Sequence, residues 1–205
     1  MRRHFVALLA TSAITLTSAC ALAFSAPVTT LDKTSTGNFE IDPSHTSVNF
    51  GISHMGFSTY QGRFDKVQGS LAFDAKNPEN SKLNVQIDAN SIDTNNEKLQ
   101  TELKSKDWFN TATFPAITFT STSVQKLSAT TGKVVGDLTL HGVTKPVVLE
   151  VTFNGTGSNP INNVEELGFS AHGTIKRSEF GISQYIPMVG DEVAINIETE
   201  MHLKQ

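Results

Sequence analysis

The stretch that decides the fold is residues 138–153, which read LTLHGVTKPVVLEVTF. Apolar residues occupy alternate positions on both sides of a six-residue interruption, HGVTKP. Alternation with a period of two is typical of a β-strand that has one apolar face and one wet face. Gly142 can adopt the positive φ of a tight turn, and Pro146 cannot donate to a central strand ladder. We therefore predict two antiparallel strands joined by a polar connection, in which His141 and Lys145 are turn residues and not a reactive site.

The same alternation recurs through most of the chain. It covers residues 48–52, 71–73, 85–87, 117–119, 169–175 and 193–201, and turn signals such as Asn77-Pro78 separate the runs. About eight antiparallel strands joined by short turns predict an all-β fold, either one closed barrel or a sandwich. Only residues 91–106 look helical. A helix of about ten residues is expected there, beginning near Asp93 or Thr94 with Thr94 as its cap.

Residues 1–23 are typical of a secretory signal peptide. Arg2 and Arg3 precede an apolar stretch, and Ala21-Leu22-Ala23 supplies a cleavage site of small residues. Cleavage after Ala23 is expected in preference to lipidation of Cys20. The small, polar residues 24–38 are then expected to form a flexible leader, and residues 39–205 a single domain without disulfides.

Composition and motifs argue for a container rather than a catalyst. Thirteen Phe against one Trp and two Tyr place much apolar surface in an interior or a cavity wall. A net charge of −4, without a basic stripe, argues against nucleic acid as a partner. No catalytic motif, metal-ligand spacing or cofactor fingerprint stands out. Ser123 and Lys126 match the catalytic motif S-x-x-K, but the match is loose. A barrel of this size can be filled by side chains or can hold one elongated ligand, and alternation alone fits both.

Four segments resemble the YceI family of bacterial exported proteins. They read FEIDPSHTSVNFGISHMGFSTYQGRFDKVQGSLAF at residues 39–73, DWFNTATFPAITFTS at residues 107–121, LTLHGVTKPVVL at residues 138–149, and RSEFGISQYIPMVGDEVAINIETE at residues 177–200. The departures are small, with Trp108 in place of the first residue of a Phe pair and Glu179 in place of Asp. The resemblance implies a lipocalin-like, extended antiparallel β-barrel with one short helix, located in the periplasm. It also implies binding of polyisoprenoids or other long-chain amphiphiles, with no catalytic activity and no cofactor.

The candidate ligand-binding residues are inward strand positions, loop aromatics and polar groups near a mouth. The channel set is Phe50, Ile52, Phe57, Phe73, Ile87, Phe109, Phe119, Leu140, Phe169, Phe180 and Ile195, and the mouth set is Tyr60, Arg63, Arg177 and Tyr185. Core packing is an equally good interpretation of the apolar set. The two arginines suit a phosphate head group, although either can instead pair with a surface carboxylate.

The favoured interpretation is a periplasmic carrier that holds a long-chain lipid or polyisoprenoid and performs no chemistry. One alternative is an enzyme or accessory protein acting on a lipid or quinone-like substrate, with a polar inward cluster around His54 or His172. The other is a stress-related structural protein with a filled barrel. The sequence leaves open a homodimer through exposed strand edges and a transient contact with a membrane.

Overall fold

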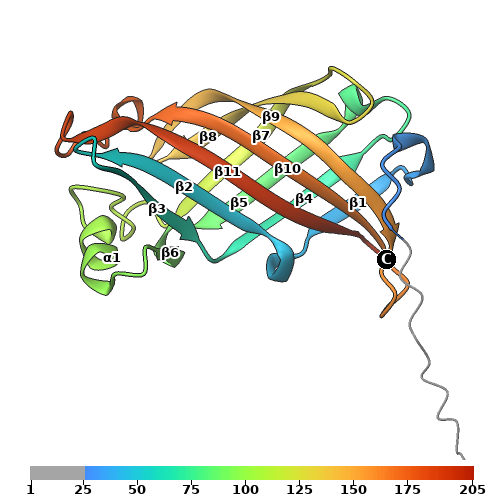
Figure 1. Ribbon diagram of the computed structural model, residues 1–205, viewed down its shortest axis with the longest axis horizontal. Helices are drawn as coiled ribbons and strands as arrows, with labels where there is room; N and C mark the ends of the chain where they lie inside the picture. The colour runs from blue at the N-terminus through green and yellow to red at the C-terminus, as the bar shows by residue number, and fades with distance from the viewer. Residues whose placement is uncertain (1–25) are drawn as a thin grey trace, which may run out of the picture.

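The computed structural model describes residues 26–205 (Figure 1). The signal peptide expected at residues 1–23, including Cys20, lies outside the described residues. The strands are β1 (Gly37–Ile41), β2 (Ser47–His54), β3 (Ser58–Phe64), β4 (Val67–Phe73), β5 (Lys82–Asp88), β6 (Ile92–Asp93), β7 (Ala116–Lys126), β8 (Thr131–Leu140), β9 (Val143–Ser158), β10 (Glu165–Lys176) and β11 (Val189–Leu203). In this part of the chain, one α-helix, α1 (Glu97–Lys104), accompanies five 3-10 turns, η1 (Leu31–Lys33), η2 (Pro43–His45), η3 (Pro78–Asn80), η4 (Ala89–Ser91) and η5 (Arg177–Phe180).

The strands form one antiparallel sheet that closes on itself. The order β1-β4-β5-β7-β8-β9-β10-β11 returns to β1, because Phe39 and Ile41 of β1 pair with Leu203 and Met201 of β11. The first half of β11 pairs instead with β2, from which β3 and β6 extend the wall. The predicted antiparallel barrel is confirmed, and its closure excludes a sandwich.

The eight strands predicted from alternation are not the eight that close the barrel. The pattern located β2 but missed β1, β3 and β6. In β3 the alternation is hidden because Gly62 stands at an inward position, directly opposite Phe50 of β2. A Cβ atom at Gly62 would lie 2.3 Å from the Phe50 ring, so the glycine makes room for the aromatic side chain.

The connection in the stretch 138–153 is shorter than predicted. β8 ends at Leu140 and β9 begins at Val143, so only His141 and Gly142 form the turn, with φ values of 52° and 75°. Two successive positive φ values match the twist of a two-residue hairpin. Pro146 lies within β9, opposite Asp137. β10 pairs with β9 only from Glu150 onwards, so Pro146 sits where one side of its strand has no neighbour.

The helix also begins later than predicted. Ile92 and Asp93 form β6 and pair with β3, which holds the chain extended beyond the expected start. Asn95 then has a φ of 54°, and the Asn96 side chain accepts a hydrogen bond from the Leu99 amide. Asn96 is therefore the N-cap of α1, and the assignment of that role to Thr94 was wrong.

The expected flexible leader lies against one end of the barrel from residue 26 onwards. Val28 and Thr156 of β9 exchange two backbone hydrogen bonds of 2.8 and 2.9 Å. The Ser35 amide donates to Glu165, and Leu31 packs against the buried cluster. Strand β1 begins at Gly37, within the segment assigned to the leader.

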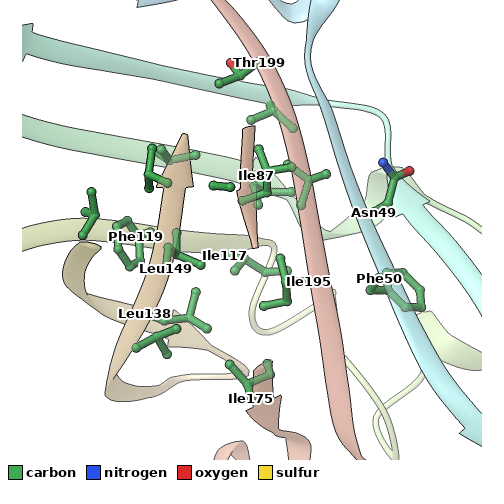
Figure 2. A pocket seen from close by; sticks show the side chains of 18 of the residues that line it. Asn49, Phe50, Ile87, Ile117, Phe119, Leu138, Leu149, Ile175, Ile195 and Thr199 are labelled. Atoms are coloured by element: carbon green, nitrogen blue, oxygen red, sulfur yellow. The ribbon is translucent and has the colours of Figure 1, made fainter. Parts of the chain in front are cut away.

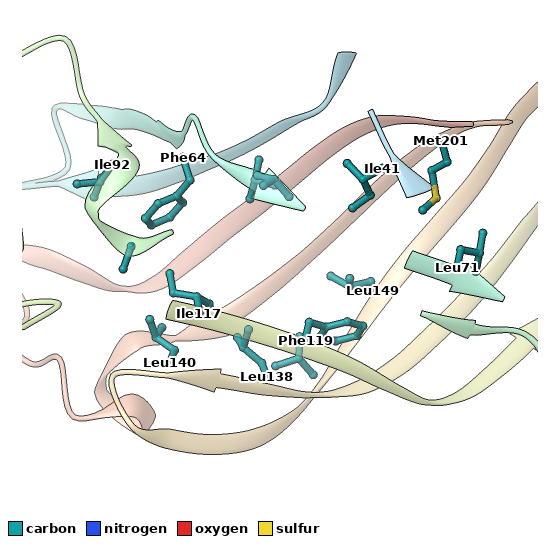
Figure 3. Packing of buried hydrophobic residues seen from close by; sticks show 14 of the residues in the cluster. Ile41, Phe64, Leu71, Ile92, Ile117, Phe119, Leu138, Leu140, Leu149 and Met201 are labelled. Carbon is teal, nitrogen blue, oxygen red and sulfur yellow. The ribbon is translucent and has the colours of Figure 1, made fainter. Parts of the chain in front are cut away.

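The apolar interior is continuous along the barrel (Figure 3). Phe39 and Leu167 are completely buried, and the ring of Phe39 lies edge-on to Phe73 with centroids 6.2 Å apart. Ile117, Phe119 and Leu149 are also buried and extend the apolar cluster along the barrel. No helix in residues 26–205 combines the length and apolar character needed to cross a bilayer.

Candidate ligand-binding cavity

The barrel encloses a cavity of about 710 Å³. Figure 2 shows side chains from several strands converging on it, among them Ile87 of β5, Phe119 of β7 and Ile195 of β11. Ile87, Phe50 and Ile175 are only partly buried although they face the interior, because they border open space. Side chains therefore do not fill the barrel, whereas the structural-protein alternative requires a filled one.

The wall of the cavity is apolar because large aliphatic and aromatic residues occupy the inward phase of the strands. Leu138 and Leu149, from the stretch that decided the fold, are among its lining residues. A Cβ atom on Gly136 would lie 2.3 Å from the Phe119 ring. Gly136 and Gly62 thus make room for the Phe119 and Phe50 rings, and a side chain at either position would force the ring to move.

Several polar groups in the lining bond to one another or to the backbone. The Thr46 and Thr199 hydroxyls are 2.8 Å apart, and the Tyr60 hydroxyl donates to the Thr94 carbonyl at 3.2 Å. Such pairing removes the cost of leaving a polar group in an apolar space. The lumen therefore offers an apolar ligand a wall whose polar atoms are largely satisfied.

Arg177 lines the cavity, but its guanidinium is committed to the backbone. It donates to the carbonyl oxygens of Gly190 (2.8 Å, from Nε), Ile182 (3.1 Å, from Nη1), and Gln184 and Val189 (2.8 and 2.9 Å, from Nη2). The Trp108 ring centroid lies 5.6 Å from its Cζ. Burial of the guanidinium lowers the pKa of Arg177 from its ordinary value. With four of its five N–H groups occupied, Arg177 cannot offer the bidentate fork that a phosphate head group requires.

A hydrogen-bonded carboxylate also fastens the segment after β10. Asp191 accepts hydrogen bonds from the amide and the hydroxyl of Ser178, at 2.9 and 2.8 Å. These bonds stabilise the charged carboxylate and lower the pKa of Asp191. Together with Arg177, they fix the β10–β11 loop at one end of the cavity.

Most of the candidate residues line the cavity. The lining includes Phe50, Ile52, Tyr60, Phe73, Ile87, Phe109, Phe119, Leu140, Phe169, Arg177, Tyr185 and Ile195. It also includes inward residues that the candidate set omitted, among them Ile117, Leu138, Leu149 and Ile197. These four follow the same alternation as the chosen ones, so the pattern already marked them. Leu31 also lines the cavity, but no alternation of apolar residues surrounds it in the sequence.

Three candidates lie away from the cavity. Phe57 is 86% exposed, because it follows the turn between β2 and β3 and points out of the molecule. Arg63 forms ion pairs with Asp65 and Asp93, at 2.8 and 3.3 Å, on the outer face of β3. Phe180 is buried to 1% exposure in η5, and its carbonyl oxygen contacts the His141 ring nitrogen at 3.1 Å.

In residues 26–205, His54 and His172 do not come together in the inward cluster that the enzyme alternative predicted. His172 is exposed and its Nε2 lies 3.1 Å from Glu150 on the outside of the barrel. His54 lines one end of the cavity. Within residues 26–205, no group of three or more His, Cys, Asp or Glu side chains is placed to hold a metal ion.

A closed antiparallel barrel around an apolar cavity defines the class of small-ligand-enclosing barrels, to which the lipocalins belong. Comparison with known proteins is more specific: residues 39–201 match the model of the YceI-like domain, and the chain belongs to this family. Protein YceI of Escherichia coli O17:K52:H18 is 42% identical over 165 residues, which are 80% of this chain and 85% of the relative.

Two solved structures share the fold. Burkholderia cenocepacia BcnA is 25% identical, with a TM-score of 0.71 over 78% of this chain and 98% of BcnA. A polyisoprenoid binding domain from Saccharophagus degradans, implicated in plant cell wall breakdown, is 16% identical with a TM-score of 0.64, over 81% and 98% of the two chains. At that identity, the second likeness shows the fold alone.

Proposed function

We propose that the protein is an exported carrier that holds one long-chain amphiphile, such as a polyisoprenoid, inside its barrel in the periplasm. The observation that carries the proposal is the apolar cavity of about 710 Å³. The polyisoprenoid binding domain from Saccharophagus degradans has the same fold, which is consistent with such a ligand. The signal-peptide pattern of residues 1–23 supports export.

Burial of an apolar chain supplies the binding free energy. Each methylene group removed from water contributes about 0.8 kcal/mol, and ordering of the flexible chain offsets part of it. The proposal rests on this burial alone and includes no chemical step.

The proposal is tested by native mass spectrometry on protein purified gently from a bacterial periplasm. We expect an excess mass that disappears on solvent extraction and a long-chain lipid in the extract. Ala171→Trp places an indole in the cavity that Ala171 lines, whereas Ala194→Trp places one on the outer face of the neighbouring strand. The first variant should lose the excess mass of the long-chain lipid, because the indole leaves room only for shorter chains, and the second should keep it.

Two results would contradict the carrier function. One is wild-type protein that has a bare polypeptide mass and gains neither mass nor melting temperature when a polyprenyl phosphate is added. The other is equal retention of lipid by both tryptophan variants, which would place the ligand outside the barrel.

A further inference from the structure

Four large apolar side chains are exposed together at one end of the barrel. Met55 (52% exposed) and Phe57 (86%) lie on the β2–β3 turn, and Tyr185 (54%) and Met188 (56%) lie on the β10–β11 loop. The two segments are neighbours, because the Met55 amide donates to the Met188 carbonyl at 2.7 Å. Figure 1 shows both segments projecting beyond the end of the barrel near α1. We call these four residues the apolar tip.

The backbone holds these side chains in place. Met55 and Gly56 have φ values of 51° and 73°, and the Phe57 amide closes the turn on the His54 carbonyl at 3.0 Å. Tyr185 packs against Trp108 with ring centroids 6.0 Å apart, and Trp108 in turn faces Arg177. The backbone and these packing contacts therefore fix the conformation of the apolar tip, although Phe57 contributes little to the packing of the interior.

The apolar tip is continuous with the cavity. His54 and Val189 pair across β2 and β11, next to Met55 and Met188, and both line the cavity, as Tyr185 does. An apolar ligand that left the barrel here would meet the exposed side chains of the tip before it met water.

We propose that the apolar tip inserts into the surface of a lipid bilayer, so that the amphiphile passes between membrane and cavity without crossing water. This inference rests on the proposed carrier function. Protruding side chains at the ends of two turns fit a deformable lipid surface, and a tyrosine with an apolar body and a polar hydroxyl suits its interface. Glu179 of η5 and Asp191 and Glu192 near the start of β11 outnumber Lys176 in this region, so attraction to anionic lipid is not what holds the protein there.

The test is co-flotation of the whole protein with phosphatidylcholine vesicles. We expect wild-type protein to float with the vesicles at low and at high salt, because insertion of apolar side chains is not screened. The double variant Phe57→Ser, Met188→Ser should reduce the vesicle partition coefficient by roughly tenfold or more. The matched control is Ile161→Ser, because Ile161 is equally exposed (86%) on the β9–β10 loop at the opposite end of the barrel. The control should float as wild type does.

A second readout separates this inference from the carrier function. Farnesol, a short isoprenoid alcohol added from solution, should raise the melting temperature of wild type and of the double variant alike, since neither substituted residue lines the cavity. Stabilisation by farnesol without vesicle binding overturns the docking proposal and leaves the carrier function standing. If Ile161→Ser loses flotation to the same extent, the docking proposal is overturned, because any exposed apolar side chain would then contribute to vesicle binding. A third result would also overturn the docking proposal: the wild type does not float but forms dimers, and the double variant stays monomeric. The apolar tip would then bind a second copy of the chain.

Discussion

At the scale of single residues, Arg177 has a structural task that its charge alone does not reveal. Its guanidinium binds carbonyl oxygens of the loop before β11, at Ile182 and Gln184, and of the first two residues of β11, where the pairing with β2 is irregular. Buried carbonyl groups need partners, and a charged donor satisfies them with stronger bonds than a neutral one. Arg177 therefore holds the loop that carries Tyr185 and Met188.

We expect Arg177→Met to lower the free energy of unfolding by roughly 3 kcal/mol, because four carbonyl groups in buried or partly buried hydrogen bonds lose their donor together. Arg63→Met is the matched control: Arg63 is a half-exposed arginine with surface ion pairs, and its loss should cost less than about 1 kcal/mol. Urea unfolding of the two variants measures the difference. Equal losses of stability in the two variants would show that the hydrogen bonds from Arg177 to the carbonyl groups contribute little to stability.

The inward positions that were chosen on strands line the cavity. Phe50, Ile87 and Ile195 line the cavity because alternation determines which face of a strand a side chain occupies. The same rule, applied to β3, would have placed Arg63 outside, since Gly62 and Phe64 beside it are inward. Phe57 and Phe180 lie outside strands, where no periodicity tells a side chain's direction. The partners of Arg177 come from a loop path that no local pattern encodes.

At the scale of elements, α1 depends on a cap that propensity alone did not identify. Both Thr94 and Asn96 are suitable capping residues, and only the pairing of β6 with β3 decides between them. Long-range contacts thus shift the start of the helix along a sequence that is locally ambiguous. Thr94 is buried, and its side chain bonds within the loop, to the Asn96 carbonyl at 3.4 Å.

Asn96→Ala should destabilise α1 by about 1 kcal/mol, because the Leu99 amide loses its side-chain acceptor. Amide hydrogen exchange reports this directly: the Leu99 amide should exchange faster, while amides in β8 and β9 keep their rates. Asn96→Asp is the control, because an aspartate retains the acceptor and suits the helix N-terminus. Unchanged exchange at Leu99 in the alanine variant would contradict the assignment of the cap.

At the scale of the whole molecule, closure and hollowness are set by contacts that the sequence pattern does not contain. The barrel closes because Phe39 pairs with Leu203, near the other end of the chain. The sequence of a strand alternates in the same way whether its apolar face packs against other side chains or borders an empty lumen. Strand count and tilt decide between the two outcomes, and both are properties of the closed sheet.

The size of the cavity leads to a prediction about ligand length. A methylene group occupies about as much room as a water molecule in the liquid, roughly 30 Å³, so a cavity of this volume accommodates roughly 20–25 carbons. Affinity should therefore rise steeply along the series geraniol, farnesol and geranylgeraniol, since each added methylene group is removed from water. It should then level off for longer prenols, whose extra units remain outside the wall. Calorimetric titration of the series measures the profile, with Ala171→Trp expected to shift the plateau to shorter chains. A steady increase beyond geranylgeraniol would mean that the barrel widens around longer ligands, and that its closed sheet is less rigid than its continuous hydrogen-bond ladder implies.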